Sequence, residues 1–121
     1  MLAASNAPAD WGLNTLGGFW GKEPAAFLLT EPDLIVIPDG SRALVIRWVW
    51  VRAGLRKNGF GLQLIGQAVM QAREKGGEFL LARVSWGWAR DFFKACGFFP
   101  TGRGTELAKD IRFDKSILGE G

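Results

Sequence analysis

Two glycines stand two residues apart in a short basic stretch, RKNGFG, at residues 56–61. The stretch follows an apolar run and precedes a helical pattern, so Gly59 and Gly61 are expected in the first turn of a helix. The first N–H groups of a helix have no partner within it, and the helix dipole adds positive charge there. Because glycine lets a phosphate approach these amides, and Arg56 and Lys57 add charge, the stretch favours a pyrophosphate site. The alternative is that the two glycines only relieve crowding where a strand meets a helix.

The stretch matches neither of two common nucleotide-binding motifs. A P-loop requires GxxxxGK[ST], which this sequence lacks. A dinucleotide-binding fold requires a third glycine where Leu64 stands, and an acidic residue on a following strand. The phosphate-binding hypothesis therefore rests on a different kind of loop.

The absence of two residue types narrows the possible chemistry. The chain has no His and no Tyr, so proton transfer must use carboxylates, Cys96, Lys, Ser, Thr, water or backbone groups. A single cysteine excludes an intrachain disulfide and a thiolate metal cluster, so we expect no metal site and a reducing, cytoplasmic compartment.

Charge and hydropathy limit the expected partners. The net charge of +3 comes from scattered basic residues, which permits an anionic ligand but disfavours nucleic acid as a partner. The N-terminus is not typical of a secretory signal, and no apolar run approaches the roughly 20 residues that span a bilayer. We therefore expect no membrane partner.

The elements that would hold the RKNGFG stretch follow an α/β pattern. Strands are expected over residues 26–29, 34–37, 44–51, 79–84, from 98 and over 106–113, and helices over 62–75 and 88–95. The second and third strands are expected to form an antiparallel hairpin. The strand, helix and strand from 44 to 84 form a βαβ unit, which predicts parallel strands in a mixed sheet. The 121 residues are expected to make one domain, with an irregular segment at 1–25.

Two blocks of sequence resemble the Gcn5-related N-acetyltransferase (GNAT) family. The pattern Arg56-x-x-Gly59-x-Gly61 is similar to the family's acyl-CoA motif, Q/R-x-x-G-x-G/A. The block WARDFFKACGF at residues 88–98 is similar to a later family pattern of Ala, an apolar-aromatic pair and Gly-Phe. The resemblance covers residues 44–109, the acyl-CoA-binding core, and fades before residue 26. It implies a GNAT-like fold truncated at the N-terminus, with an acceptor pocket that is abbreviated or completed by another subunit.

The resemblance implies an acyl-CoA-dependent N-acyltransferase. The cosubstrate would be acetyl-CoA or another acyl-CoA, and a small-molecule or peptide amine would attack the thioester directly. The pantetheine arm would lie along one strand, in the splay between strands 44–51 and 79–84, and the amides after it would hold the pyrophosphate. The cofactor-binding residues expected on this basis are Trp50, Val51, Arg56, Lys57, Asn58, Gly59, Phe60, Gly61 and Leu62.

The sequence departs from the family where a general acid would stand. Phe93 occupies the position of the usual Tyr, which is taken to protonate the departing thiolate, a contribution of about 10²–10⁴ in rate. A thiol of pKa about 8.5 can still leave as the thiolate near neutral pH. Cys96 is a candidate substitute donor, although a Cys before Gly-Phe is more often a buried apolar residue. Glu31 is a candidate base at the edge of a cleft, and the catalytic residues are otherwise unknown.

These departures leave a second interpretation open. The chain could be a catalytically inactive module on the GNAT fold, with or without bound CoA, because a fold does not by itself carry activity.

The aromatic residues also have two interpretations. Trp48 and Trp50 lie two residues apart on one face of a strand and are expected chiefly in the core. The alternative is an aromatic wall for an acyl group, a flat acceptor or a partner subunit. Aromatic residues make up 12% of the chain, and exposed apolar patches tend to be covered, so a homodimer is a further hypothesis.

Overall fold

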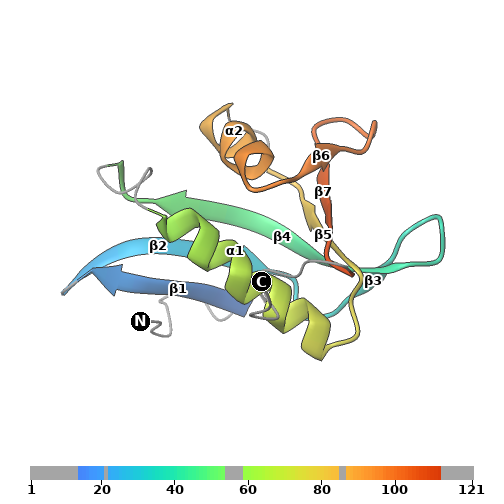
Figure 1. The fold of residues 1–121 in the computed structure, drawn as a ribbon, viewed down its shortest axis with the longest axis horizontal. Coiled ribbons are helices and arrows are strands. Elements are labelled where there is room, and N and C mark those ends of the chain that lie inside the picture. Colours follow the sequence, from blue (N-terminus) through green and yellow to red (C-terminus); the bar gives the residue numbers. More distant parts are fainter. Residues whose placement is uncertain (1–13, 21, 54–58, 85–86, 113–121) are drawn as a thin grey trace, which may run out of the picture.

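A computed structural model describes residues 14–20, 22–53, 59–84 and 87–112. The described elements are β1 Asn14–Trp20, β2 Glu23–Thr30, β3 Ile35–Val36, β4 Arg42–Val51, α1 Phe60–Glu74, β5 Phe79–Ala82, α2 Gly87–Ala95, β6 Phe99–Pro100 and β7 Leu107–Asp110. The strands form one mixed sheet in the order β1-β2-β4-β5-β7-β6, and β3 pairs with β4 outside this path (Figure 1).

The unit of β4, α1 and β5 forms as the sequence predicts. β4 and β5 are parallel, and α1 connects them across one face of the sheet, where Figure 1 shows it in front of β2 and β4. The helix ends as Gly76 adopts φ 87°, a left-handed conformation that favours glycine. Neither helix of the described residues is long and apolar enough to cross a membrane.

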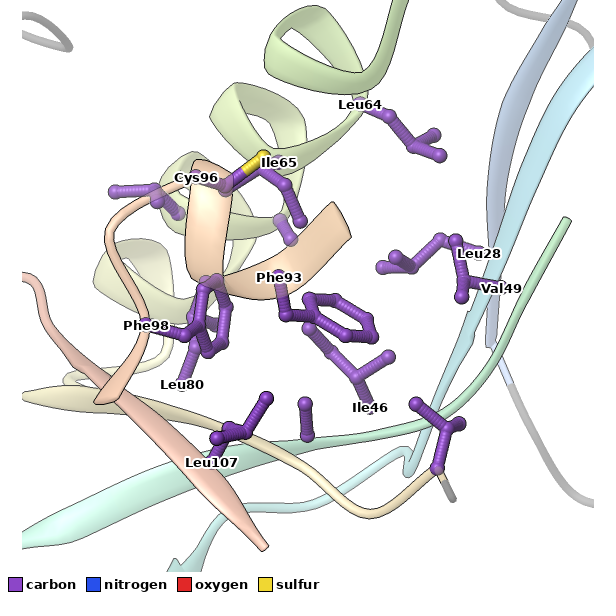
Figure 2. Close-up of a cluster of buried hydrophobic side chains, with 14 of the residues drawn as sticks. Leu28, Ile46, Val49, Leu64, Ile65, Leu80, Phe93, Cys96, Phe98 and Leu107 are labelled. Carbon is purple, nitrogen blue, oxygen red and sulfur yellow. The ribbon is translucent and has the colours of Figure 1, made fainter. Parts of the chain in front are cut away.

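Both helices pack on the same face of the sheet. One cluster of buried side chains joins residues of α1, such as Ile65 and Val69, to Phe93 of α2 and to Ile46 and Leu80 of the strands (Figure 2). A smaller cluster on the opposite face contains Ala43, Val45, Leu81 and Ala108. β4 is thus buried on both faces over its first half, as predicted for a central strand.

The expectation of an irregular segment at residues 1–25 is wrong where the structure describes that segment. Asn14 to Trp20 form β1, which pairs antiparallel with β2. A Cβ on Gly17 would overlap the Ala26 carbonyl and the Phe27 side chain, so glycine allows the two strands to approach closely here. Residues 1–13 lie outside the described residues.

The predicted hairpin of strands 34–37 and 44–51 is much shorter than expected. It is reduced to β3, in which Ile35 pairs with Ala43 and Val36 with Arg42. The main antiparallel partner of β4 is β2 instead. Pro32 and Pro38 flank β3, and proline cannot donate a hydrogen bond to a strand ladder, which keeps this strand short.

Candidate functional site

The pairing between β4 and β5 covers only the first half of β4. It ends where Ile46 pairs with Ala82, after which the Arg83 N–H donates to the Ile46 carbonyl at 3.0 Å. β4 continues to Val51 beside β2, and Figure 1 shows it diverging from β5. Among the described residues, no strand lies beside 47–50 on the β5 side. An extended ligand can therefore bind along this edge as an added strand.

A β-bulge lies at the point where the two strands part. Thr30 of β2 pairs with Ile46, and Leu29 pairs with Trp48, so Arg47 is an extra residue on β4. Bulges increase local twist and re-aim side chains, and they are frequent beside active sites. The bulge thus accompanies the turn of β4 away from β5.

The amino end of α1 follows β4 and is open to an anion. Gly59 is the N-cap, with φ 82° and ψ −4°. No side chain of the described residues caps the helix, and its first turn carries no acidic residue. A Cβ on Gly59 would meet no atom of the described residues within 4 Å, its chain neighbours aside. The first-turn amides and the positive end of the helix dipole therefore face an uncrowded surface, which suits a phosphate.

The structure describes the expected pyrophosphate site only from Gly59 onward. Arg56, Lys57 and Asn58 lie outside the described residues. Phe60 is the first residue of α1. Leu62, in the first turn, has 66% of its surface exposed, so its side chain does not contribute to the core.

Gly61 relieves crowding, which was the alternative interpretation of the two glycines, but it does so between two helices and not where a strand meets a helix. A Cβ at this position would overlap the ring of Phe92, which reaches α1 from α2. The lack of a side chain at Gly61 is thus explained by contact between the two helices. Gly59 differs, because its left-handed φ favours glycine while no other described residue lies close to where a side chain would be.

Trp48 and Trp50 lie on the sheet face away from the helices. Their neighbours Val49 and Val51 belong to the core beneath the helices, whereas neither tryptophan is buried. The expectation that the two tryptophans belong chiefly to the core is therefore wrong. Trp48 is 38% exposed, and the ring of Trp50 stacks on Phe27 with centroids 6.1 Å apart. An aromatic surface therefore lies beside the diverging strands.

Phe93, at the position of the family's usual tyrosine, is a core residue. Its side chain is fully buried, and its ring centroid lies 5.1 Å from that of Phe92 and 4.9 Å from that of Phe98. Figure 2 shows it among Ile46, Leu80 and other apolar side chains. The ring cannot donate a proton, and it contributes packing instead.

Cys96 belongs to the same buried cluster (Figure 2). Burial raises the pKa of its thiol to about 11, although the charge of Lys109 opposes this shift. The Lys109 ammonium group donates to the Cys96 carbonyl at 3.1 Å. The thiol is therefore protonated near neutral pH and is enclosed by apolar side chains, as expected for a small buried residue.

Glu31 lies next to the bulge of β4 and forms an ion pair there. Its Oε2 accepts a hydrogen bond from Arg47 Nη1 at 3.0 Å, and its backbone N–H donates to the Val45 carbonyl. The Glu31 side chain is 32% exposed. The structure thus brings Glu31 close to the point where the strands part, but its carboxylate would have to leave this pair to accept a proton.

A buried carboxylate that sequence reasoning did not single out lies beyond β5. Glu106, only 7% exposed, pairs with Arg83 at 2.9 Å and with Arg103 at 3.3 Å, and its Oε1 accepts from the Thr101 hydroxyl at 3.0 Å. Burial raises its pKa, but the hydrogen bonds from Arg83 and Thr101 and the charges of Arg103 and Arg83 outweigh it and lower the pKa overall. Arg83 lies 23 residues from Glu106 in the sequence, so no local sequence signal connects it to the other three. The network fixes Arg83, which follows the last pair between β4 and β5.

Groups that could hold a metal ion are lacking in the described part of the chain. No cluster of three or more His, Cys, Asp and Glu side chains is present there.

The sequence from residue 8 to residue 98 matches the model of the acetyltransferase (GNAT) family. No curated protein matches the sequence significantly.

Solved structures with the same fold share little sequence with this chain. A mutant AtaT toxin, bound to the C-terminus of the antitoxin AtaR and to acetyl-CoA, superposes with a TM-score of 0.69 at 14% identity over 93% of this chain and 76% of the toxin. AtaT complexed with acetyl-methionyl-tRNAfMet gives 0.64 at 14% identity, over 91% and 76%. A putative GNAT-family acetyltransferase from Desulfovibrio desulfuricans gives 0.64 at 18% identity, over 83% and 70%. These similarities show the fold.

Proposed function

Because the chain belongs to the acetyltransferase (GNAT) family, we propose that it transfers an acyl group, most simply acetyl, from coenzyme A to an amine. The observation that carries this proposal is the separation of β4 from β5 after Ile46 and Ala82, together with the uncapped amino end of α1 at Gly59. The free strand edge and the uncapped end of the helix lie at the two ends of one connection. This arrangement suits a ligand that is extended at one end and carries phosphates at the other.

We propose that each part of the donor is held by backbone groups. The edge of β4 at Trp50 and Val51 would bind the pantetheine arm. The amides from Gly59 to Leu62 would bind the pyrophosphate, with Arg56, Lys57 and Asn58 completing the site. Two observations support this assignment. No described residue crowds Gly59 at the end of the helix, and the first turn carries no carboxylate that would compete for the dipole.

The chemistry would rely on positioning more than on acid–base groups. Coenzyme A, when bound, supplies the acyl group as a thioester. The amine nitrogen would bond to the thioester carbonyl carbon while the C–S bond breaks, and the amine proton would pass to solvent. The thiol can leave as the thiolate, so Phe93 in place of a proton donor slows the reaction without preventing it.

Calorimetry of acetyl-CoA binding to Gly59→Asp and Gly59→Asn tests the donor site. Asp and Asn have nearly the same shape, and both tolerate a left-handed φ better than most residues, so the pair differs mainly in charge. We expect the aspartate to weaken binding at least about tenfold relative to the asparagine, since its charge would lie beside the pyrophosphate. Gly40→Asp is the control, because Gly40 also has a positive φ, 91°, and open space around it.

Equal affinities for Gly59→Asp and Gly59→Asn would contradict the placement of the phosphates. An unmodified protein that binds no acetyl-CoA at all would overturn the donor proposal itself.

A second proposal is a catalytically inactive GNAT module that binds CoA or has lost it. This second proposal is supported by the residues considered for acid–base catalysis. Phe93 and Cys96 are buried, and Glu31 is paired with Arg47. The release of free coenzyme A thiol in the presence of amines distinguishes the two proposals. Binding of acetyl-CoA without release, over a broad panel of acceptors, would favour the inactive module.

The acceptor class has two candidates. A small-molecule or peptide amine is the first, and the amine of an aminoacyl-tRNA is the second. The second is supported by the fold shared with AtaT, whose complex contains acetyl-methionyl-tRNAfMet, so the expectation against nucleic acid as a partner loses support. Trp48, which is 38% exposed, offers a stacking surface near the diverging strands, next to Arg47, which is paired with Glu31.

Salt dependence separates these acceptor classes. Turnover of an aminoacyl-tRNA should fall steeply between 50 and 200 mM salt, on the order of tenfold or more, because phosphate contacts release counterions. Turnover of a neutral small amine should change little over the same range. Activity on peptides alone, with no competition from tRNA, would exclude the second candidate.

A further inference from the structure

We propose that the edge of the sheet at β1, with the adjoining groove on α1, is the contact between two copies of this chain. The proposal names the surface of a homodimer, and it holds whether or not the chain transfers an acyl group. Three features of the described residues carry it: a groove, a strand edge without charges or proline, and two glutamine oxygens that lack hydrogen-bond partners.

The groove lies between α1 and the edge strand. It has a volume of about 320 Å³ and is lined by Leu16 of β1 and by Gln67, Met70, Gln71 and Glu74 of α1. Met70 is 56% exposed although it is a large apolar residue. Met70, a residue type that is normally buried, therefore lies exposed at the rim of this apolar groove.

The strand next to this groove lacks the charges and the proline that often protect a sheet edge. β1 pairs with β2 on one side, and in the described part of the chain no strand lies on its other side. Edge strands commonly carry charges or proline that prevent pairing with another chain. Residues 14–20, NTLGGFW, contain neither, and the register is irregular only between Gly18 and Phe19.

Charge favours a second copy over a charged partner on this surface. No charged residue occurs in β1, nor in α1 from Phe60 to Ala72, and Glu74 is the one charged residue that lines the groove. A nucleic acid would find no cation there. Two copies that each carry a net charge of +3 repel each other least when they meet through such an uncharged surface.

The groove also contains polar atoms that lack partners. Gln67 Oε1 and Gln71 Oε1 are buried and accept no hydrogen bond from the described residues. They lie one helical turn apart and so face the same side of α1. An amide group is both donor and acceptor, so the glutamines of two copies can satisfy each other across a two-fold axis once their side chains turn from this buried position towards the partner.

Symmetry connects these features. Two identical strands that pair antiparallel are related by a two-fold axis without further adjustment. Pairing of β1 with its copy would extend the sheet across both molecules, with strands about 4.8 Å apart. It would also bring the two α1 helices towards each other over the new strand pair, where Met70 of each copy can fill the groove.

Sedimentation equilibrium of the full chain tests the proposal. A single strand edge and one groove make a small interface, and small interfaces associate weakly. The protein should therefore be examined from roughly 1 µM to 1 mM. We expect a reversible dimer, and Met70→Lys should raise its dissociation constant at least about tenfold, because two lysines would meet near the axis. Val36→Lys and Phe99→Lys are matched controls, since these residues are 70% and 47% exposed and lie on other parts of the sheet.

Hydrogen exchange separates strand pairing from helix contact alone. In an antiparallel pair, alternate amides of β1 point away from β2, so these amides should gain protection as the protein concentration rises through the dissociation constant. A monomer at every concentration would overturn the proposal. A dimer broken by Phe99→Lys but not by Met70→Lys, or one in which β1 gains no protection, would overturn it as well.

Discussion

The ring of Phe92 in α2 occupies the space where a side chain on Gly61 of α1 would lie. The contact places the first turn of α1 directly against α2, which follows β5. A glycine inside an acyl-CoA-like motif thus has a structural reason to be glycine, independent of any ligand. The amino end of α1 is held by the second helix of the fold.

Gly61→Ala should therefore destabilise the protein. Overpacking costs about 1–3 kcal/mol, which exceeds the gain of up to about 1 kcal/mol that alanine brings to a helix. In a Phe92→Ala background the overlap is absent, and the same substitution should become neutral or slightly stabilising. Chemical denaturation of the four proteins measures this coupling, and equal costs in both backgrounds would show that Phe92 does not limit the site.

The Glu106 network should make stability depend on acidic pH. Because the folded state holds the pKa of this carboxyl below its ordinary value, its contribution is complete above about pH 5. It is lost as the pH falls below about 4, where the unfolded chain takes up the proton first. Glu106→Gln should cost about 1–3 kcal/mol at pH 7 and flatten this acid dependence.

Glu74→Gln is the control for the Glu106 experiment. Glu74 is exposed, so its removal should leave both the stability at pH 7 and the acid limb nearly unchanged. Urea denaturation of the three proteins between pH 3 and 7 gives both quantities. An acid limb that persists in full in Glu106→Gln would assign it to other carboxyls.

The elements at the centre of the fold, β4, α1 and α2, were predictable because each carries a strong pattern in its own stretch of sequence. The apolar run before RKNGFG predicts β4, and the helical spacing after it, ended by Gly76–Gly77, predicts α1. The errors are small and lie at the ends of the elements. The helix was expected over 62–75 and spans Phe60–Glu74. The second helix was expected over 88–95 and spans Gly87–Ala95. Each of these elements is specified by residues that lie close together in the sequence.

The edge strand and the polar network were not predictable in this way. β1 contains Gly17 and Gly18, which weaken strand propensity, and only the close approach of β2 explains the first of them. Glu106 and Arg83 are far apart in the sequence and meet only because β5 and β7 are neighbours. Both features depend on tertiary pairing, which a single sequence does not display.

Cys96 should react slowly with thiol reagents in the folded protein. The thiolate is the reactive form, and burial raises the thiol pKa to about 11, so little thiolate is present at pH 8. Labelling by a disulfide reagent should be at least about a hundredfold faster after unfolding in guanidinium. Fast labelling of the native protein would place Cys96 at an accessible site and restore its candidacy as a proton donor.

The same thiol should make the stability of the protein fall at alkaline pH. A pKa raised in the folded state means that the folded protein holds this proton longer than the unfolded chain does. The contribution is full below about pH 8.5 and declines as the pH rises towards 11. Cys96→Ala should show a smaller decline over this range, in urea titrations at each pH, and an identical decline would assign the effect to other groups.

Phe93→Tyr tests whether a hydroxyl at the family's usual position would serve catalysis in this chain. Phe93 is fully buried between Phe92 and Phe98, so a hydroxyl added to its ring would be buried without an evident partner. We expect a loss of about 1–3 kcal/mol in the free energy of unfolding and no gain in the rate of coenzyme A release. Phe98→Tyr, in the same cluster, should show a similar loss and serves as the matched control.

A different result for Phe93→Tyr would change the assignment of the site. Unchanged stability together with faster release, and with a new alkaline limb in the pH–rate profile near the tyrosine pKa of about 10, would show that the ring edge reaches the thioester. Slower release at unchanged stability would indicate that the ring shapes the acyl pocket. The predicted outcome, a less stable protein with unchanged turnover, would mean that proton donation to the thiolate does not depend on α2.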